Sequence, residues 1–224
     1  MTTLTEIQTK TIKAIVRIFE TGKITPDYGR IGWDSNGGIS YGICQASRNS
    51  GNLAKIVHFY CEHKDARFAN QLRNYLVQCD ARERNLDFNT AFKAFLTEAG
   101  RDPVMAEIQE QFFDENFFIP AFRYAQQIGL YEVLSIAVMY DSTVHGSRQR
   151  LVEKTNTYSG RIAAIGEHSW IGDYVFRRRA WLIDCGGILA KTIYRMDTFE
   201  GLIQAQNWDL DLPITAHGIT IKGA

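Results

Sequence analysis

Residues 130–144 read LYEVLSIAVMYDSTV, and a helix built from them carries apolar side chains on most of its sides. A surface helix has one polar face, so this pattern predicts a buried helix at the centre of the molecule. Apolar residues follow helical spacing almost everywhere else, except from about Gly22 to Gly42. The sequence therefore predicts a mainly α fold: one domain over residues 1–224, with two lobes around the central helix and a small β hairpin.

The positions of the other helices follow from apolar spacing, capping residues and prolines. Asp102 followed by Pro103 predicts an N-cap with proline in the first turn. Residues 210–221 alternate weakly between apolar and polar, a pattern typical of strands. The predicted helices cover residues 68–79, residues 88–96, a segment from Pro103, a segment from Pro120, and residues 170–185 before Gly186 and Gly187.

Length and composition set limits on the class of protein. The chain has 224 residues, 45% of them hydrophobic, which fits a well-filled core and the size of a globular enzyme. Lysine plus arginine equals aspartate plus glutamate at 25 each, so net charge gives no argument for a nucleic-acid partner. No apolar run approaches the roughly 20 residues of a membrane span, and residues 1–6 lack the pattern of a signal peptide. We expect cytoplasmic synthesis and no membrane insertion.

Cysteine and histidine spacing gives no sign of a metal site. The cysteines are Cys44, Cys61, Cys79 and Cys185, with no Cys-x-x-Cys pair, and we expect buried thiols. The five histidines lack metal-ligand spacing, and the glycine pairs do not form a phosphate loop. We expect no metal and no cofactor.

Glu20 is the first candidate for chemistry. It extends the apolar stripe of Ile12, Val16 and Phe19, and desolvation there favours the uncharged carboxyl group that a general acid needs. The alternative is an ordinary helix-terminal glutamate in solvent, because Thr21-Gly22 resembles a C-cap. A carboxylate near the negative end of a helix dipole is electrostatically unfavourable and lowers the stability of the helix. We therefore expect a glutamate at this position to serve a function.

A second carboxylate lies in WDSNGGISYG, residues 33–42. Small residues around Asp34 let a bulky sugar ring approach the backbone, and Ser40 can hold a water molecule against the carboxylate. The alternative for Asp34 is a turn residue, because Asp-Ser-Asn-Gly favours turns whatever the function. Asp27, after Pro26, competes with Asp34 under the same alternative.

Polar groups also end the central helix. Asp141 and His145 are four residues apart and can pair, which favours a hydrogen-bonded brace beneath a cleft over catalysis. The run Arg177-Arg178-Arg179 is typical of a solvated face, but we expect Arg178 or Arg179 to bury against a carboxylate of the central helix.

These motifs resemble the bacterial chitosanase family, glycoside hydrolase family 46, of the lysozyme-like superfamily. The resemblance rests on the segments FETG (19–22), GISYG (38–42) with Asp34 and Gln45, SGNL (50–53), YDSTVHG (140–146) and residues 170–182. Within it, the chain looks most similar to phage lysins and secretion-system effectors. The resemblance implies a two-lobed helical fold with a hairpin beside a substrate cleft.

It also implies an inverting mechanism, with Glu20 as general acid, Asp34 as general base and Ser40 in place of a threonine that positions the water. An inverting pair holds its carboxyl groups about 6.5 to 9.5 Å apart to admit water. Ser35-Asn36 lengthen the turn relative to the family pattern, so Asp27 stays open as the base. Residues expected to bind substrate are Tyr28, Arg30, Tyr41, Gln45, Asp141 and His145.

The charges between Gly22 and Ser50 guide the choice of substrate. Only Asp27 and Asp34 are acidic there, against Lys23, Arg30 and Arg48, a balance that suits an anionic or neutral polymer better than polycationic chitosan. We therefore expect a muramidase that cuts peptidoglycan at the cell wall or periplasm, with an inhibitor protein if it is an effector. A chitosanase and a catalytically inactive lysozyme-like binding module are the alternatives.

Overall fold

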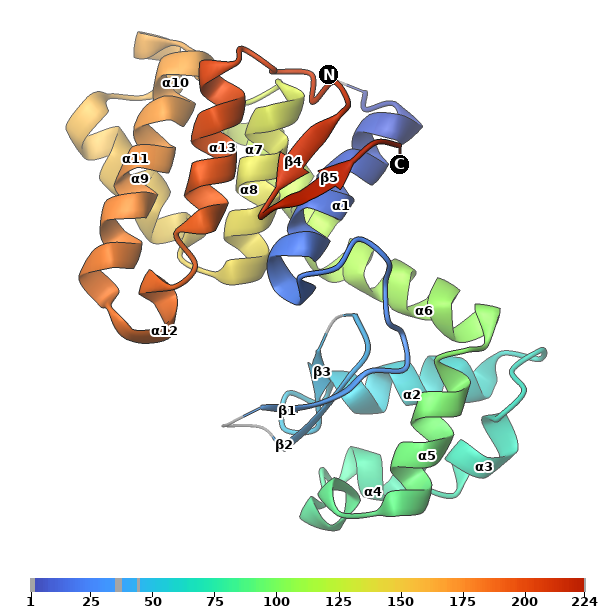
Figure 1. Ribbon diagram of the computed structural model, residues 1–224. Coiled ribbons are helices and arrows are strands. Elements are labelled where there is room, and N and C mark those ends of the chain that lie inside the picture. The colour runs from blue at the N-terminus through green and yellow to red at the C-terminus, as the bar shows by residue number, and fades with distance from the viewer. Residues whose placement is uncertain (1–2, 35–37, 44, 224) are drawn as a thin grey trace. The chain divides into compact units, whose positions relative to one another are not determined.

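The computed structural model describes residues 3–34, 38–43 and 45–223. The chain forms two compact units: unit 1 comprises residues 1–24 and 117–224, and unit 2 comprises residues 25–116. Most of the chain is helical, with short antiparallel strands in each unit (Figure 1), which confirms the predicted fold class. No described helix is both long and apolar enough to cross a membrane.

Unit 1 is built around helix α8 (Val133–His145), in which every residue from Val133 to Ser142 is buried. Helices α1 (Glu6–Thr21), α7 (Ile119–Ile128), α9 (Arg148–Ser159), α11 (Glu167–Cys185) and α13 (Tyr194–Gln204) pack against it (Figure 1). The predicted buried helix is therefore confirmed. The remaining elements of unit 1 are α10 (Ile162–Ile165), α12 (Gly187–Ala190) and the strands β4 (Ile214–Ala216) and β5 (Ile219–Ile221), which form a hairpin.

Helix α1 has well-defined ends. Thr5 and Gln8 form a reciprocal capping box at its start. Gly22, with a φ of 67°, ends it in the left-handed conformation that glycine adopts without strain, as Thr21-Gly22 predicts. Ile12, Ile15, Val16 and Phe19 are buried, so the position of Glu20 at the end of this helix is fixed by the core.

Unit 2 combines a three-stranded sheet with helices. The strands β1 (Ile31–Asp34), β2 (Gly38–Tyr41) and β3 (Ala46–Ser47) pair antiparallel, with Trp33 opposite Ile39 and Asp34 opposite Gly38. The helices are α2 (Asn52–Glu62), α3 (Ala69–Arg73), α4 (Leu76–Asp80), the 3₁₀ turn η1 (Arg84–Asp87), α5 (Thr90–Ala99) and α6 (Pro103–Phe113). The chain passes to unit 1 through a π-helical turn, η2 (Asp114–Phe118).

Two sequence predictions in these units need correction. The single helix expected over residues 68–79 is two short helices, because the helical backbone breaks at Asn74 and Tyr75, where the Tyr75 ring packs on Phe92 and Phe95. Of the thiols expected to be buried, Cys61 and Cys79 are, Cys185 is exposed, and Cys44 lies outside the described residues. Asp102 caps α6 as predicted, accepting a hydrogen bond from the Val104 amide.

Candidate active site

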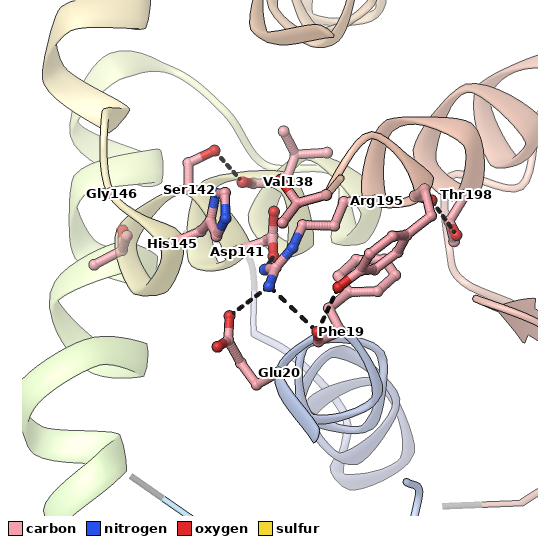
Figure 2. Close-up of polar contacts among 12 residues, drawn as sticks. Phe19, Glu20, Val138, Asp141, Ser142, His145, Gly146, Arg195 and Thr198 are labelled. Carbon is pink, nitrogen blue, oxygen red and sulfur yellow. Dashed lines mark hydrogen bonds and ion pairs between the residues drawn. The ribbon is translucent and has the colours of Figure 1, made fainter. Parts of the chain in front are cut away.

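Glu20 lies at the end of α1 and is part of an ion-pair chain (Figure 2). Its Oε1 accepts a hydrogen bond from Nη2 of Arg195 at 2.8 Å, and Nη1 of Arg195 donates to Asp141 at 2.6 Å. The side chain of Glu20 keeps 24% of its exposure, against 3% for Arg195 and none for Asp141. Glu20 is therefore a half-buried carboxyl group held by a buried guanidinium, not a group on a purely apolar face as the sequence predicts.

The backbone around Glu20 reinforces this geometry. The Phe19 carbonyl accepts a hydrogen bond from Arg195 at 3.3 Å (Figure 2). The same carbonyl accepts a second hydrogen bond from the Tyr194 hydroxyl at 2.8 Å. The Arg195 guanidinium also lies over the Phe19 ring, 5.4 Å from its centroid. Helix α13 thus fixes both the last turn of α1 and the carboxyl group of Glu20 within it.

Asp141 is the buried central residue of this row of ion pairs. Arg178 donates to its second oxygen at 2.5 Å, so one carboxylate accepts from two arginines of different helices. Burial alone would raise the pKa of Asp141, but the charges of Arg178 and Arg195 hold it below its usual value. This agrees with the predicted brace and identifies Arg178 as the buried arginine. The side chain of Asp141 is fully buried, so a polymeric substrate cannot contact it. This corrects the assignment of Asp141 to substrate binding.

His145 does not pair directly with Asp141. Arg178 lies between them and donates from Nη2 to Nδ1 of His145 at 3.3 Å, a bond that requires the neutral imidazole. Burial, together with the charges of Arg195 and Arg178, lowers the pKa of His145 to about 4. His145 is partly exposed and remains a candidate for substrate contact.

In unit 2, three predicted site residues line one pocket. Arg30, Ser40 and Gln45 surround it together with Trp33, Gly32 and Gly42, and its volume is about 60 Å³. That space is large enough to admit a water molecule. A Cβ atom at Gly32 would lie 2.6 Å from the Ser40 hydroxyl, so the glycine keeps the space beside this hydroxyl open. The pocket suits the predicted role of Ser40 in holding a water molecule.

The remaining predicted residues of unit 2 have different surroundings. Tyr41 is fully buried, and its hydroxyl donates to the Leu96 carbonyl at 2.7 Å, which corrects its assignment to substrate binding. Burial raises the pKa of Tyr41 above its usual value. Tyr28 is partly exposed and donates to Glu110 at 2.9 Å. Asp27 is exposed, and Asp34 ends β1, with its side chain outside the described part of the structure.

Arg48 has a structural role that the sequence does not reveal. Its Nε and Nη2 atoms donate to Asp87 at 3.0 and 3.2 Å, and both side chains are almost fully buried. Asp87 also accepts from the Ile39 amide at 3.0 Å, which fixes strand β2 to η1. Arg48 is therefore neutralised inside unit 2 and cannot attract an anionic substrate.

Comparison with known proteins assigns the chain to a family. The model of glycosyl hydrolase family 46 matches residues 14–214, which includes segments of both units. This chain belongs to glycosyl hydrolase family 46. The family 46 chain is thus a glycoside hydrolase, as the motifs around Glu20 and Asp34 predict.

Three relatives of this family 46 hydrolase are chitosanases. A chitosanase of Bacillus subtilis (strain 168) is 24% identical over 230 residues, covering 94% of this chain and 82% of the relative. A glutamate-to-alanine mutant chitosanase from Bacillus subtilis MY002, solved with 6 GlcN, gives a TM-score of 0.81 at 21% identity, covering 98% of this chain and 100% of that one. A Gynuella sunshinyii chitosanase in complex with chitotetraose gives 0.77 at 21% identity, covering 98% of both chains.

These findings correct the predicted substrate. The expectation of a peptidoglycan muramidase is wrong, because the chain belongs to glycosyl hydrolase family 46 and the relatives above are chitosanases. The expected closeness to phage lysins and secretion-system effectors gains no support. The burial of Arg48 is one physical reason for the error, since this cation was counted as part of a surface that attracts anions.

No cluster of three or more histidine, cysteine, aspartate or glutamate side chains able to hold a metal ion occurs among the described residues. The two arginines missing from the sequence-based site, Arg195 and Arg48, each lie one or two residues from buried apolar positions. An arginine within an apolar stripe is the signal that can reveal such a residue, because a buried cation needs a carboxylate partner.

Asp141→Ala is expected to lower the free energy of unfolding by about 3–5 kcal/mol, because it leaves Arg178 and Arg195 buried without their shared counter-ion. Urea denaturation measures the change. Asp197→Ala is the matched control, because Asp197 pairs with Arg179 at 2.5 Å but is 63% exposed, and its loss should cost less than about 1 kcal/mol. Equal costs for the two variants would remove the bracing role of Asp141.

His145 should make stability depend on pH between about 6.5 and 4. In that interval the unfolded chain binds a proton at His145 that the folded protein does not, because the folded pKa is about 4. Stability therefore falls as pH falls through this window. His145→Gln keeps an acceptor for Arg178 and should show a smaller loss between pH 7 and pH 4.5 in urea titrations. Identical losses in both proteins would contradict the assignment.

Proposed function

We propose that this glycoside hydrolase is a chitosanase that cleaves β-1,4 links between glucosamine units. The family 46 match over residues 14–214 carries the proposal. It is supported by the curated chitosanase relative and by the chitosanase folds solved with 6 GlcN and with chitotetraose.

We assign the chemical roles to the two carboxyl groups. Glu20 donates a proton to the glycosidic oxygen as the bond to the anomeric carbon breaks. Asp34 takes a proton from a water molecule that attacks the opposite face of the same carbon, and Ser40 orients that water. Attack from the face opposite the leaving group inverts the anomeric configuration. The pocket beside Ser40, with its volume of about 60 Å³, supports the role of this hydroxyl.

The contact between Arg195 and Glu20 fixes the position of this carboxyl group. When Glu20 gives up its proton it becomes a carboxylate, and the guanidinium 2.8 Å away stabilises the negative charge that develops during the transfer. Arg195 needs no reorganisation to do so, because Asp141 and the Phe19 carbonyl already hold it. We therefore regard Arg195 as a positioning residue for Glu20.

The test is release of reducing ends from chitosan, from fully acetylated chitin and from purified peptidoglycan, with mass analysis of the fragments. We expect glucosamine oligomers from chitosan and no muropeptides. Proton NMR of the first products should show the α-anomer, since an inverting enzyme converts a β link to that form. Muropeptides without glucosamine oligomers would contradict the proposal, and no product from any of the three polymers would favour a binding module.

A further inference from the structure

Two large aromatic side chains lie exposed side by side on unit 2. Trp33, on β1, is 63% exposed, and Phe88, directly after η1, is 73% exposed. Their ring centroids are 6.4 Å apart, with an angle of 47° between the planes. Tryptophan is usually well buried in folded proteins, so a neighbouring pair this exposed marks a candidate binding surface. We call Trp33 and Phe88 the aromatic pair.

The aromatic pair is fixed by the buried contacts beneath it. Trp33 lies opposite Ile39 in the ladder between β1 and β2, and the Ile39 amide donates to Asp87, the residue before Phe88. Arg48 holds the same carboxylate through two hydrogen bonds. Gly38, with a φ of 70°, permits this approach, since a Cβ atom there would lie 2.6 Å from the Asp87 carboxylate. Both rings thus stand on one rigid support, which lowers the entropy lost on binding.

The aromatic pair also lies next to predicted catalytic residues of the same unit. Trp33 lines the small pocket together with Ser40, Arg30 and Gln45. Along the chain it immediately precedes Asp34, at the end of β1. A sugar ring that rests on Trp33 therefore lies at the border of this pocket.

We infer that the aromatic pair is a stacking platform for one glucosamine ring of the polymer. The apolar face of a pyranose ring can lie against the Trp33 indole, and its ammonium group is attracted to the aromatic face by a cation–π interaction. Phe88 extends the surface and limits the tilt of the ring. This inference rests on the proposed function, because it names a contact with the same substrate.

The experiment measures binding and turnover separately. Binding of glucosamine hexamer is measured by calorimetry in the Glu20→Gln background, and KM and kcat are measured in the active protein. Trp33→Ala should weaken binding and raise KM by about 5- to 30-fold. Trp33→Phe should recover most of the loss, and Phe88→Ala should lose less than Trp33→Ala. Phe176→Ala is the matched control, because Phe176 is also 63% exposed but lies on α11 in unit 1.

Since the side chain of Trp33 is mostly exposed, thermal unfolding of Trp33→Ala should match that of the parent protein. Hexamer affinity and KM unchanged in Trp33→Ala, while the parent still cleaves chitosan, would overturn the platform and leave the proposed function intact. A parent protein that neither binds nor cleaves glucosamine polymers would overturn both the platform and the proposed function. That result requires only the parent protein, so the two failures can be distinguished.

Discussion

Glu20→Gln should lower kcat on chitosan by about 10²- to 10⁴-fold, because the amide cannot protonate the glycosidic oxygen. Its carbonyl oxygen can still accept the hydrogen bond that Arg195 donates to Glu20, so the fold of unit 1 should survive. Initial rates on a soluble glucosamine oligomer, with circular dichroism and thermal unfolding, measure both effects.

Glu200→Gln is the control for this experiment. Glu200 also forms an ion pair with an arginine, Arg179, at 2.7 Å and keeps 34% of its side-chain exposure. Loss of that pair should leave kcat within about twofold of the parent. A Glu20→Gln protein that retains kcat would remove Glu20 from the role of general acid.

Asp34→Asn is expected to cost a similar factor, about 10²- to 10⁴-fold in kcat, because an amide cannot take a proton from the attacking water. Asp27→Asn tests the competing assignment of the base. Asp27 is exposed and belongs to the same unit, so its change should affect KM more than kcat. The reverse result, a damaging Asp27→Asn and a harmless Asp34→Asn, would make Asp27 the base. Proton NMR of the first products from whichever variant is slower would show whether the reaction still inverts the anomeric carbon.

Local patterns in the sequence predict much of the fold. The apolar run of residues 130–144 predicts helix α8, because a helix without a polar face must be covered on all sides. Asp102-Pro103 and Thr21-Gly22 predict helix ends, because capping depends on neighbouring residues. The break at Tyr75 is not predictable in this way, since it depends on packing against Phe92 and Phe95, about 20 residues away.

The site is predicted less completely because its contacts join distant segments. Motifs predict Glu20 and Asp34 as the catalytic pair, but the partner of Glu20 is Arg195, which lies 175 positions further along the chain. Counting charges between Gly22 and Ser50 fails for the same reason: Asp87 lies outside that window and neutralises Arg48 within unit 2. A charge predicts substrate preference only if its side chain reaches the surface.

The ion pairs that run from Glu20 through Arg195 and Asp141 to Arg178 join helices α1, α13, α8 and α11. The inner members of this row of ion pairs are buried, so Glu20 cannot lose its support by the opening of a surface loop. On heating, the temperature at which activity is lost should coincide with the cooperative unfolding of unit 1. A change in the packing of any of these four helices can therefore shift the Glu20 carboxyl group without a change at the substrate.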